Sequence, residues 1–300
     1  MHYERTTLPI RLYRTNRADL PPVRWLEQLA DRLGPARAHR FGHGDHDHGE
    51  SATDAEADVL AAIRERAGDI HETLSHDHGV FAVEFVGSTG GGKTKLIEEL
   101  VERAPADDRI GAIVGDVAGE DDATRLREYG IAVENVNTGK ECHLDPGGIE
   151  TALDAFDLEK LDTLYVENVG NMVCPADFPL GATVRVLVVS TTEGDDVVAK
   201  HPLLVQKCDA AVVNKVDLAE AVGTDLDRVR ADLGRVAPEV PVFETDAKSG
   251  AGVDELAEFL ESKRTKHDCG HDHGHDHGEH EYGHEHGHDD EHDRVPHSSE

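Results

Sequence analysis

Apolar runs alternate with segments of helical periodicity from residue 80 onward. Seven runs are short and apolar, which predicts buried strands at 81–86, 110–114, 132–136, 163–166, 184–190, 210–213 and 242–245. The segments between them predict helices at 93–103, 120–128, 149–156, 225–233 and 253–263. This alternation is typical of a doubly wound α/β fold, with a mainly parallel sheet covered by helices on both faces. Such folds bind ligands at the carboxyl ends of their strands.

A further helix is predicted ahead of the first strand, within residues 51–79. Thr53 and Glu56 fit a capping box at its start. Its apolar side chains recur every three or four residues, which places them on one stripe: Leu60, Ile63, Ala67, Ile70 and Leu74. We expect this stripe to pack on the α/β domain, assigned to residues 80–264, or to pair with a second copy of the chain.

Both ends of the chain differ in composition from this domain. Residues 1–50 are first basic, with a predicted helix at 22–33 and no assignable function, and then rich in histidine. Residues 265–300 alternate His with Asp, Glu and Gly, which predicts a disordered tail. Because histidine-rich composition is typical of metal binding, the candidate low-affinity metal-binding residues are His43, His46, His48, His271, His273, His275 and His277.

Net charge restricts the possible partners. Asp and Glu number 62 against 30 Lys and Arg, which gives a formal net charge of −32. This charge argues against nonspecific binding to nucleic acid or to an anionic membrane. No stretch approaches the roughly 20 apolar residues of a membrane span, and the first residues do not form a signal peptide, so we expect a cytoplasmic protein.

A glycine-rich sequence follows the first predicted strand. Residues 87–94 are GSTGGGKT, which matches the GxxxxGK[ST] phosphate-binding loop between a strand and a helix. Its backbone N–H groups and the helix N-terminus would surround phosphates, the lysine would neutralise them, and the threonine hydroxyl would bind Mg²⁺. The candidate phosphate-binding residues are Gly87, Gly90, Gly91, Gly92, Lys93 and Thr94.

A second motif, NKVD, indicates which base is bound. Asn214, Lys215 and Asp217 follow the strand predicted at 210–213. The Asp217 carboxylate can accept the paired N–H donors of guanine, whereas adenine would leave it unsatisfied at about 1–3 kcal/mol. The sequence therefore predicts GTP as the nucleotide. Asp246 and Ala247 follow the last strand, where GTPases usually carry Ser-Ala-Lys, and we assign them to the base pocket despite the Asp.

Two acidic residues at strand ends are candidate Mg²⁺ ligands together with Thr94. Asp116 follows the second predicted strand and Glu167 the fourth. Mg²⁺ takes one or two carboxylates besides phosphate oxygens and water, so Lys93, Asp116 and Glu167 are the candidate catalytic residues. Acidic loop residues in a very acidic chain are the alternative. The acids at 120–122 equally suit the first turn of the next helix.

Cysteine and histidine also follow strands on this edge. Cys142 and His143 lie beyond the third predicted strand, and Cys174 lies beyond the fourth. Two thiolates and an imidazole suit Zn²⁺ or Ni²⁺, and a three-ligand site can be completed by a second copy of the chain. The alternative from chemistry alone is that both cysteines are small, half-buried residues without a ligand.

The sequences GSTGGGKT, GDVAGEDDATRL, NTGKECHLD, ENVGNMVCP and NKVD together resemble the hydrogenase nickel-incorporation GTPase family (HypB), a relative of the urease accessory GTPase (UreG). The resemblance runs from about residue 81 to 260, with every motif in order. Cys142 and His143 are adjacent, as in the hydrogenase branch, whereas the urease branch has Cys-Pro-His. Some members carry an N-terminal CxxCGC nickel site, but no cysteine precedes Cys142 here.

The resemblance implies a GTPase that binds nickel and zinc at Cys142, His143 and Cys174 and that forms a homodimer. It also implies two partners, a HypA-type nickel delivery protein and the hydrogenase large-subunit precursor. The loops that carry Asp116 and Glu167 would sense the γ-phosphate through Mg²⁺, and Glu167 lies a few residues from Cys174, so hydrolysis would move a metal ligand. Two alternatives stay open: a urease maturation GTPase, and a nickel-storage protein that acts through its histidine-rich stretches.

Overall fold

The computed structural model describes residues 52–117, 119–139 and 141–271. Seven strands form one sheet in the order β3-β2-β4-β1-β5-β6-β7, and every neighbouring pair is parallel. The strands are β1 (Phe81–Gly87), β2 (Ile110–Asp116), β3 (Ala132–Asn137), β4 (Thr163–Glu167), β5 (Val184–Ser190), β6 (Ala210–Asn214) and β7 (Val242–Thr245). The predicted strands and the doubly wound fold are confirmed, and the sheet is entirely parallel.

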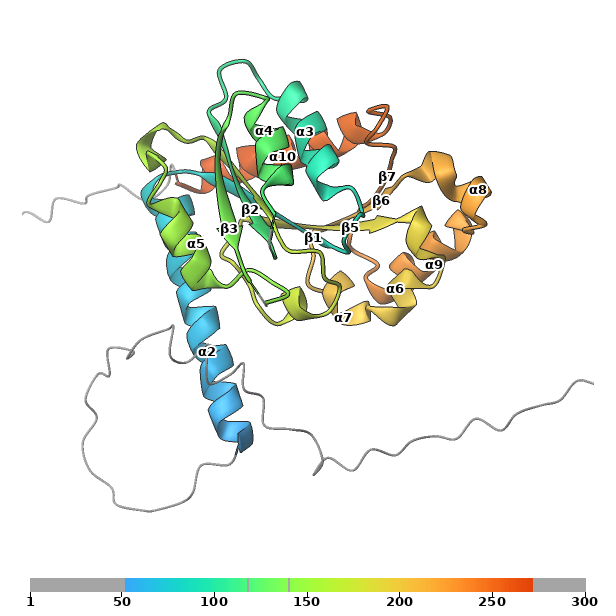
Figure 1. The fold of residues 1–300 in the computed structure, drawn as a ribbon, viewed down its shortest axis with the longest axis horizontal. Coiled ribbons are helices and arrows are strands. Elements are labelled where there is room, and N and C mark those ends of the chain that lie inside the picture. Colours follow the sequence, from blue (N-terminus) through green and yellow to red (C-terminus); the bar gives the residue numbers. More distant parts are fainter. Residues whose placement is uncertain (1–51, 118, 140, 272–300) are drawn as a thin grey trace, which may run out of the picture.

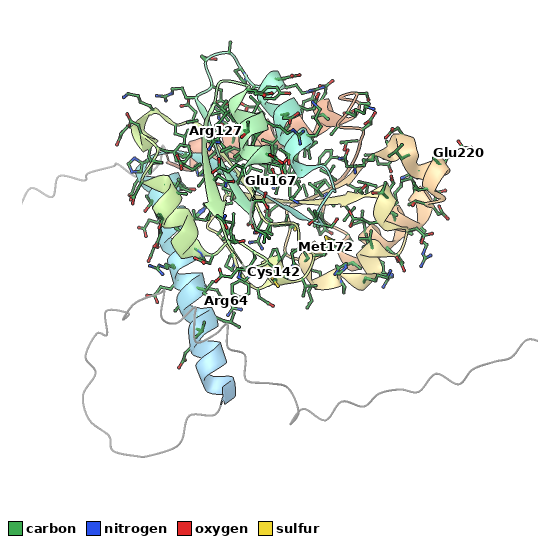
Figure 2. The ribbon with its side chains drawn as sticks, in the orientation of Figure 1. Arg64, Arg127, Cys142, Glu167, Met172 and Glu220 are labelled. Carbon is green, nitrogen blue, oxygen red and sulfur yellow. The ribbon has the colours of Figure 1, made fainter. Side chains whose placement is uncertain are left out.

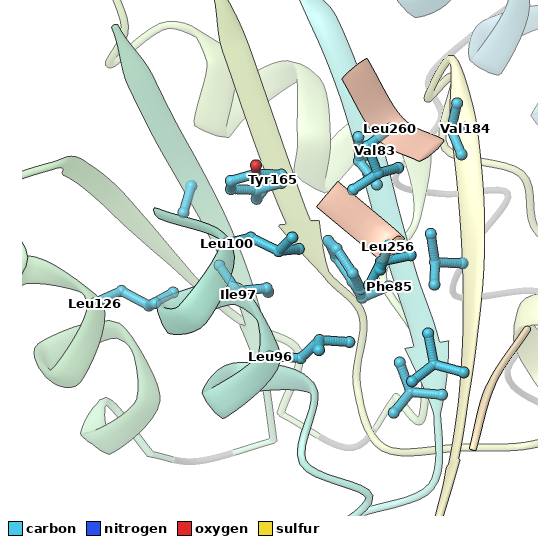
Figure 3. Close-up of a cluster of buried hydrophobic side chains, with 14 of the residues drawn as sticks. Val83, Phe85, Leu96, Ile97, Leu100, Leu126, Tyr165, Val184, Leu256 and Leu260 are labelled. Carbon is cyan, nitrogen blue, oxygen red and sulfur yellow. The ribbon is translucent and has the colours of Figure 1, made fainter. Parts of the chain in front are cut away.

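Helices cover both faces of the sheet, as the continuous apolar strands require. Alternate residues of β1 point to opposite faces, so Val83 and Phe85 contact one helical layer while Ala82 and Val86 contact the other. Figure 3 shows buried side chains of the first of these layers, on the face of the sheet to which Phe85 points. It consists of α3 (Lys93–Arg103), α4 (Asp121–Arg127) and α10 (Val253–His271). The opposite face carries α5 (Pro146–Leu153), α6 (Val197–Lys200), α7 (Pro202–Val205) and α9 (Leu226–Val236) (Figure 1).

The helix ahead of β1 packs on the domain through its predicted stripe. This helix, α2 (Ala52–His71), continues into a π-helical turn, η2 (Glu72–Asp77). Ile70 and Leu74 join the core beneath α5, and Ile63 packs on Phe178. The N-terminal part of α2 projects beyond the domain in Figure 1. Because the helix begins at Ala52, Thr53 lies inside it, and the predicted capping box is wrong.

Other helix boundaries differ from the predicted ones where a cap or a tertiary contact decides them. α5 begins at Pro146, three residues before the predicted start, because the Asp145 side chain accepts a hydrogen bond from the Gly148 N–H and caps the helix. α10 continues to His271, so the predicted tail is helical over residues 265–271. The remaining tail residues and the calls on residues 1–51 lie outside the described residues.

The short helices α6, α7 and α8 (Ala219–Val222) were not predicted, because about one turn of helix is too short to show a periodic pattern. Among the residues that the structure describes, none of the helices combines the length and the apolar character needed to cross a bilayer.

Candidate functional site

The glycine-rich loop joins β1 to α3 at the carboxyl edge of the sheet. Its glycines are required because the backbone φ is +75° at Gly90 and +98° at Gly92, in the region that side chains disfavour. A Cβ atom at Gly92 would also lie 2.3 Å from the Asn214 amide nitrogen. The loop and the NKVD motif are therefore in direct contact, as a shared nucleotide pocket requires.

Lys93 is buried in this loop, with 5% of its surface exposed. Its amine donates hydrogen bonds to the carbonyl oxygens of Gly87 (3.4 Å) and Ser88 (3.1 Å). Burial lowers the pKa of Lys93, and the nearby acidic side chains of Glu167, Asp122 and Glu193 oppose this effect. The buried cation therefore points into the loop where phosphates would lie.

Glu167 and Thr94 meet at the start of α3. The Thr94 hydroxyl donates a hydrogen bond of 2.9 Å to Glu167 Oε1, while Glu167 Oε2 has no hydrogen-bond partner in the described part of the chain. Burial raises the pKa of Glu167 to about 7. An unpartnered carboxylate oxygen beside a hydroxyl is a donor set that fits Mg²⁺, which prefers oxygen ligands.

A cavity of about 290 Å³ lies over these groups. It is lined by the loop, by Lys93, Thr94 and Glu167, and by Asp122 and Arg125 of α4. Asp116 does not line this cavity, because its Oδ1 accepts a hydrogen bond of 2.6 Å from the Val117 N–H of its own loop. In this conformation Asp122, and not Asp116, lines the cavity over the phosphate loop.

The NKVD motif and the turn after β7 form one hydrogen-bonded unit with the phosphate loop. The Asn214 amide donates to the Gly91 carbonyl (2.9 Å), and its oxygen accepts from the Ala247 N–H (3.0 Å). Lys215, at a φ of +60°, donates to the Gly90 carbonyl (2.6 Å). The carboxylate of Asp217 is exposed, which leaves it open to a base.

Asp246, which we predicted to lie in the base pocket, has hydrogen-bond partners within its own turn. Its carboxylate accepts hydrogen bonds from the Ser249 hydroxyl (2.6 Å) and the Lys248 N–H (3.0 Å). The Ser249 hydrogen bond lowers the pKa of Asp246. The side chain therefore stabilises the turn that presents Ala247.

Cys142, His143 and Cys174 lie together at the same sheet edge, with their ligand atoms all within 4.8 Å of one another. The two sulfur atoms are 2.9 Å apart, and the Cys142 sulfur is 3.8 Å from His143 Nδ1. Figure 2 shows where Cys142 and Glu167 lie in the domain. The two loops that carry the cysteines thus meet at the shared sheet edge, as predicted, although β2 lies between β3 and β4.

The surroundings of the cluster suit a soft metal ion. Burial and the adjacent Cys142 thiol raise the pKa of Cys174 to about 11, so a bound cation must displace its proton. Burial lowers the pKa of His143, which keeps the imidazole in the neutral form that binds metals. Two sulfurs and one imidazole fit Ni²⁺ or Zn²⁺ and leave at least one coordination position open.

Two supporting residues of the cluster were not identified from the sequence. The His143 ring lies against Phe178, with ring centroids 3.9 Å apart. The Asn171 amide lies 3.6 Å from the Cys174 sulfur as a hydrogen-bond donor. Asn171 lies three positions before Cys174 in the sequence, but the contact between their side chains depends on how the loop turns.

The raised pKa of Glu167 leads to a stability prediction. When the pKa of a carboxyl group is higher in the folded than in the unfolded state, its ionisation destabilises the folded protein. The contribution of Glu167 to the free energy of unfolding therefore falls as pH rises from 4.5 through 7. We expect Glu167→Gln, which keeps the shape and removes the charge, to be about 3 kcal/mol more stable than the parent protein at pH 8 without nucleotide or Mg²⁺. At pH 4.5 the difference should nearly vanish. Urea unfolding at both pH values measures it, and a difference independent of pH would contradict the burial of the charge.

Comparison with known proteins identifies the family. The model of the CobW/HypB/UreG nucleotide-binding domain matches residues 81–244. The probable hydrogenase maturation factor HypB of Methanocaldococcus jannaschii is 43% identical over 208 residues, which cover 69% of this chain and 94% of that protein. Among solved structures, HypB of Archaeoglobus fulgidus has a TM-score of 0.64 and 44% identity, covering 68% of this chain and 99% of the other.

A second solved structure, HypB of Helicobacter pylori in complex with nickel, has a TM-score of 0.64 and 33% identity and covers 68% of this chain and 95% of the other. The matched region contains the phosphate loop, the NKVD motif and the Cys/His cluster. By both sequence and fold, the chain belongs to the CobW/HypB/UreG family, in its HypB branch.

Proposed function

We propose that the chain is a GTP-hydrolysing metallochaperone that binds nickel and delivers it for the maturation of [NiFe] hydrogenase. The observation that carries this proposal is the position of the Cys142, His143 and Cys174 cluster at the sheet edge that also holds the phosphate loop. The HypB relatives named as hydrogenase maturation factors, and the nickel complex of the Helicobacter pylori protein, support the choice of metal and pathway.

GTP hydrolysis is assigned to the cavity above the phosphate loop. Lys93 would exchange its loop carbonyls for the β- and γ-phosphate oxygens, and Asp217 would hold guanine. Thr94 and Glu167 would hold Mg²⁺, which supplies positive charge to the phosphates when bound. Asp122, which lines the cavity, and Asp116, after a rotation away from its own loop, are candidates for the remaining acidic position.

The metal site is coupled to this cavity through one short loop. Glu167 ends β4 at the phosphates, and Cys174 begins the 3₁₀ turn η4 (Cys174–Ala176) on the same connection. When Glu167 exchanges Thr94 for a new partner, the loop that carries Cys174 must adjust. Nickel held by the two thiolates and the imidazole is the cargo, and its affinity would differ between the GTP and GDP forms.

The test is the nickel affinity of the full chain with a nonhydrolysable GTP analogue and with GDP. Thiolate-to-nickel absorption in the near ultraviolet, measured in a Cys269→Ala background, should be the readout, because without the Cys269 thiol it excludes nickel bound to the histidine-rich stretches. We expect affinities that differ at least about tenfold, which is a coupling free energy of about 1.4 kcal/mol. The variant His201→Ala, which changes a histidine outside the cluster, is the control. Equal affinities would remove the coupling.

A second copy of the chain is the proposed source of further metal ligands. The site completed in this way would also bind zinc. Val117, which follows Asp116, and Val173, which precedes Cys174, are 42% and 63% exposed and would form part of this homodimer contact. The delivery partner would be a HypA-type protein and the recipient a hydrogenase large-subunit precursor. The thiols act in reduced form, which fits a cytoplasmic location.

A further inference from the structure

A charged residue lies in the middle of the most buried strand. Glu84, on β1, is 1% exposed, and its neighbours in the strand are apolar. Its Oε2 accepts a hydrogen bond of 2.7 Å from Arg185 Nε on β5, and its Oε1 accepts one of 2.8 Å from the Asn168 amide. A buried ion pair is seldom more stabilising than an apolar pair of the same size, so its presence favours a role in positioning.

Asn168 joins this carboxylate to the first metal-binding loop. The Asn168 side chain is buried, and its oxygen accepts hydrogen bonds from the N–H groups of Leu144 (3.0 Å) and Val169 (2.9 Å). Leu144 directly follows His143 in the chain. The backbone beside the imidazole ligand is therefore held by an amide that is itself held by Glu84.

Arg185 joins the same carboxylate to the second metal-binding loop. Its Nη1 donates to the carbonyl oxygen of Pro175 (3.3 Å) and its Nη2 to that of Phe178 (3.4 Å). Pro175 directly follows Cys174, and the Phe178 ring lies against His143. One buried carboxylate thus contacts two side chains, and each of them holds a different half of the cluster.

We propose that Glu84, through Asn168 and Arg185, positions the two halves of the Cys142, His143 and Cys174 cluster relative to each other. Each of the three residues is a positioning residue, because the structure shows none of them among the potential ligands. Hydrogen-bonded supports of this kind typically change metal affinity about 10- to 100-fold when they are removed.

The same hydrogen bonds specify how the nucleotide state is coupled to the metal site. This second inference rests on the proposed function. Asn168 follows Glu167 directly, so a displacement of Glu167 at the phosphates moves the amide that holds Leu144. Arg185, on β5, belongs to a different strand and keeps the Pro175 side of the cluster in place. The two loops would therefore separate or approach when the nucleotide changes.

The experiment measures nickel affinity of the full chain without nucleotide, again by thiolate-to-nickel absorption. We expect Asn168→Ala to lower this affinity about 10- to 100-fold and to shift the absorption band. Arg185→Lys keeps a cation beside Glu84 but offers one nitrogen in place of three, and should lower the affinity in the same direction. Thr163→Val is the matched control, since Thr163 is a buried polar residue at the start of β4, the strand that Asn168 directly follows.

An exchange of side chains covers the case in which Asn168→Ala does not fold. Asn168→Asp alone places two carboxylates together and should lower nickel affinity. The double variant Glu84→Gln with Asn168→Asp restores one donor and one acceptor between the two positions, with the total charge unchanged, and should recover most of the affinity. A double variant as weak as the single one, or a folded Asn168→Ala with unchanged affinity and spectrum, would overturn the proposal.

These outcomes separate the positioning role from the proposed function. If the parent protein binds nickel equally in its GTP-analogue and GDP forms, the coupling fails, while the nucleotide-free affinity of Asn168→Ala still decides the positioning role. If the parent protein shows the coupling and Asn168→Ala does not change the nucleotide-free affinity, the proposed function stands and the positioning role is wrong.

Discussion

Lys93→Ala should lower the rate of GTP hydrolysis by about 100- to 1,000-fold, the loss typical of removing one group that stabilises developing charge. Lys93 is buried against the phosphate loop, and its amine already points at the loop carbonyls of Gly87 and Ser88. The substitution would leave the phosphates without this cation and would leave Glu167 without its nearest positive charge. Phosphate release with saturating GTP and Mg²⁺ measures the rate, and a fluorescent GTP analogue measures binding.

The adjacent lysine provides the control for this experiment. Lys95 also lines the cavity, but its amine forms ion pairs with Glu98 (3.1 Å) and Glu99 (2.7 Å) on its own helix. Lys95→Ala should therefore leave hydrolysis within about threefold of the parent rate, because an ion pair of this kind contributes little beyond local helix stability. Comparable losses in both variants would show that the cavity, and not the Lys93 amine, is what the substitution disturbs.

The fold could be predicted because buried parallel strands have a simple signature. A strand covered on both faces is a continuous apolar run, and β1, β5 and β6 show such runs in the sequence. The placement of Cys142 and Cys174 at one edge follows from the same fact, since all strands of a parallel sheet end at one edge, although β2 separates β3 from β4, the strands that they follow. The sheet edge at which these residues lie was therefore accessible from the sequence, whereas the order of the strands was not.

Contacts set by loop conformation were not accessible. The sequence could not show that Asp116 turns to its own backbone while Asp122 lines the cavity over the phosphate loop, because both choices satisfy the same local pattern. Glu84 is visible as a charge in an apolar strand, but Arg185, its partner, is 101 positions away. Pairing at that distance depends on which strands become neighbours.

Replacing either cluster cysteine should have the largest effect on nickel binding. We expect Cys142→Ala and Cys174→Ala each to lower thiolate-dependent nickel affinity more than about 100-fold, beyond the usual effect of removing a supporting residue. A two-ligand remnant cannot hold the ion in a fixed geometry, so the near-ultraviolet absorption should disappear in both variants. Stability of the metal-free protein should change little in Cys142→Ala, because Cys142 is exposed.

The third described cysteine separates ligation from a general effect of cysteine loss. Cys208 is buried in the core, burial raises the pKa of its thiol, and the thiol donates a hydrogen bond to the Leu204 carbonyl (3.1 Å). Cys208→Ala should therefore reduce the free energy of unfolding by roughly 1 kcal/mol and leave nickel binding unchanged. Loss of nickel in this variant, or its retention in Cys174→Ala, would mean that the ion lies elsewhere and that the sheet edge binds nucleotide alone.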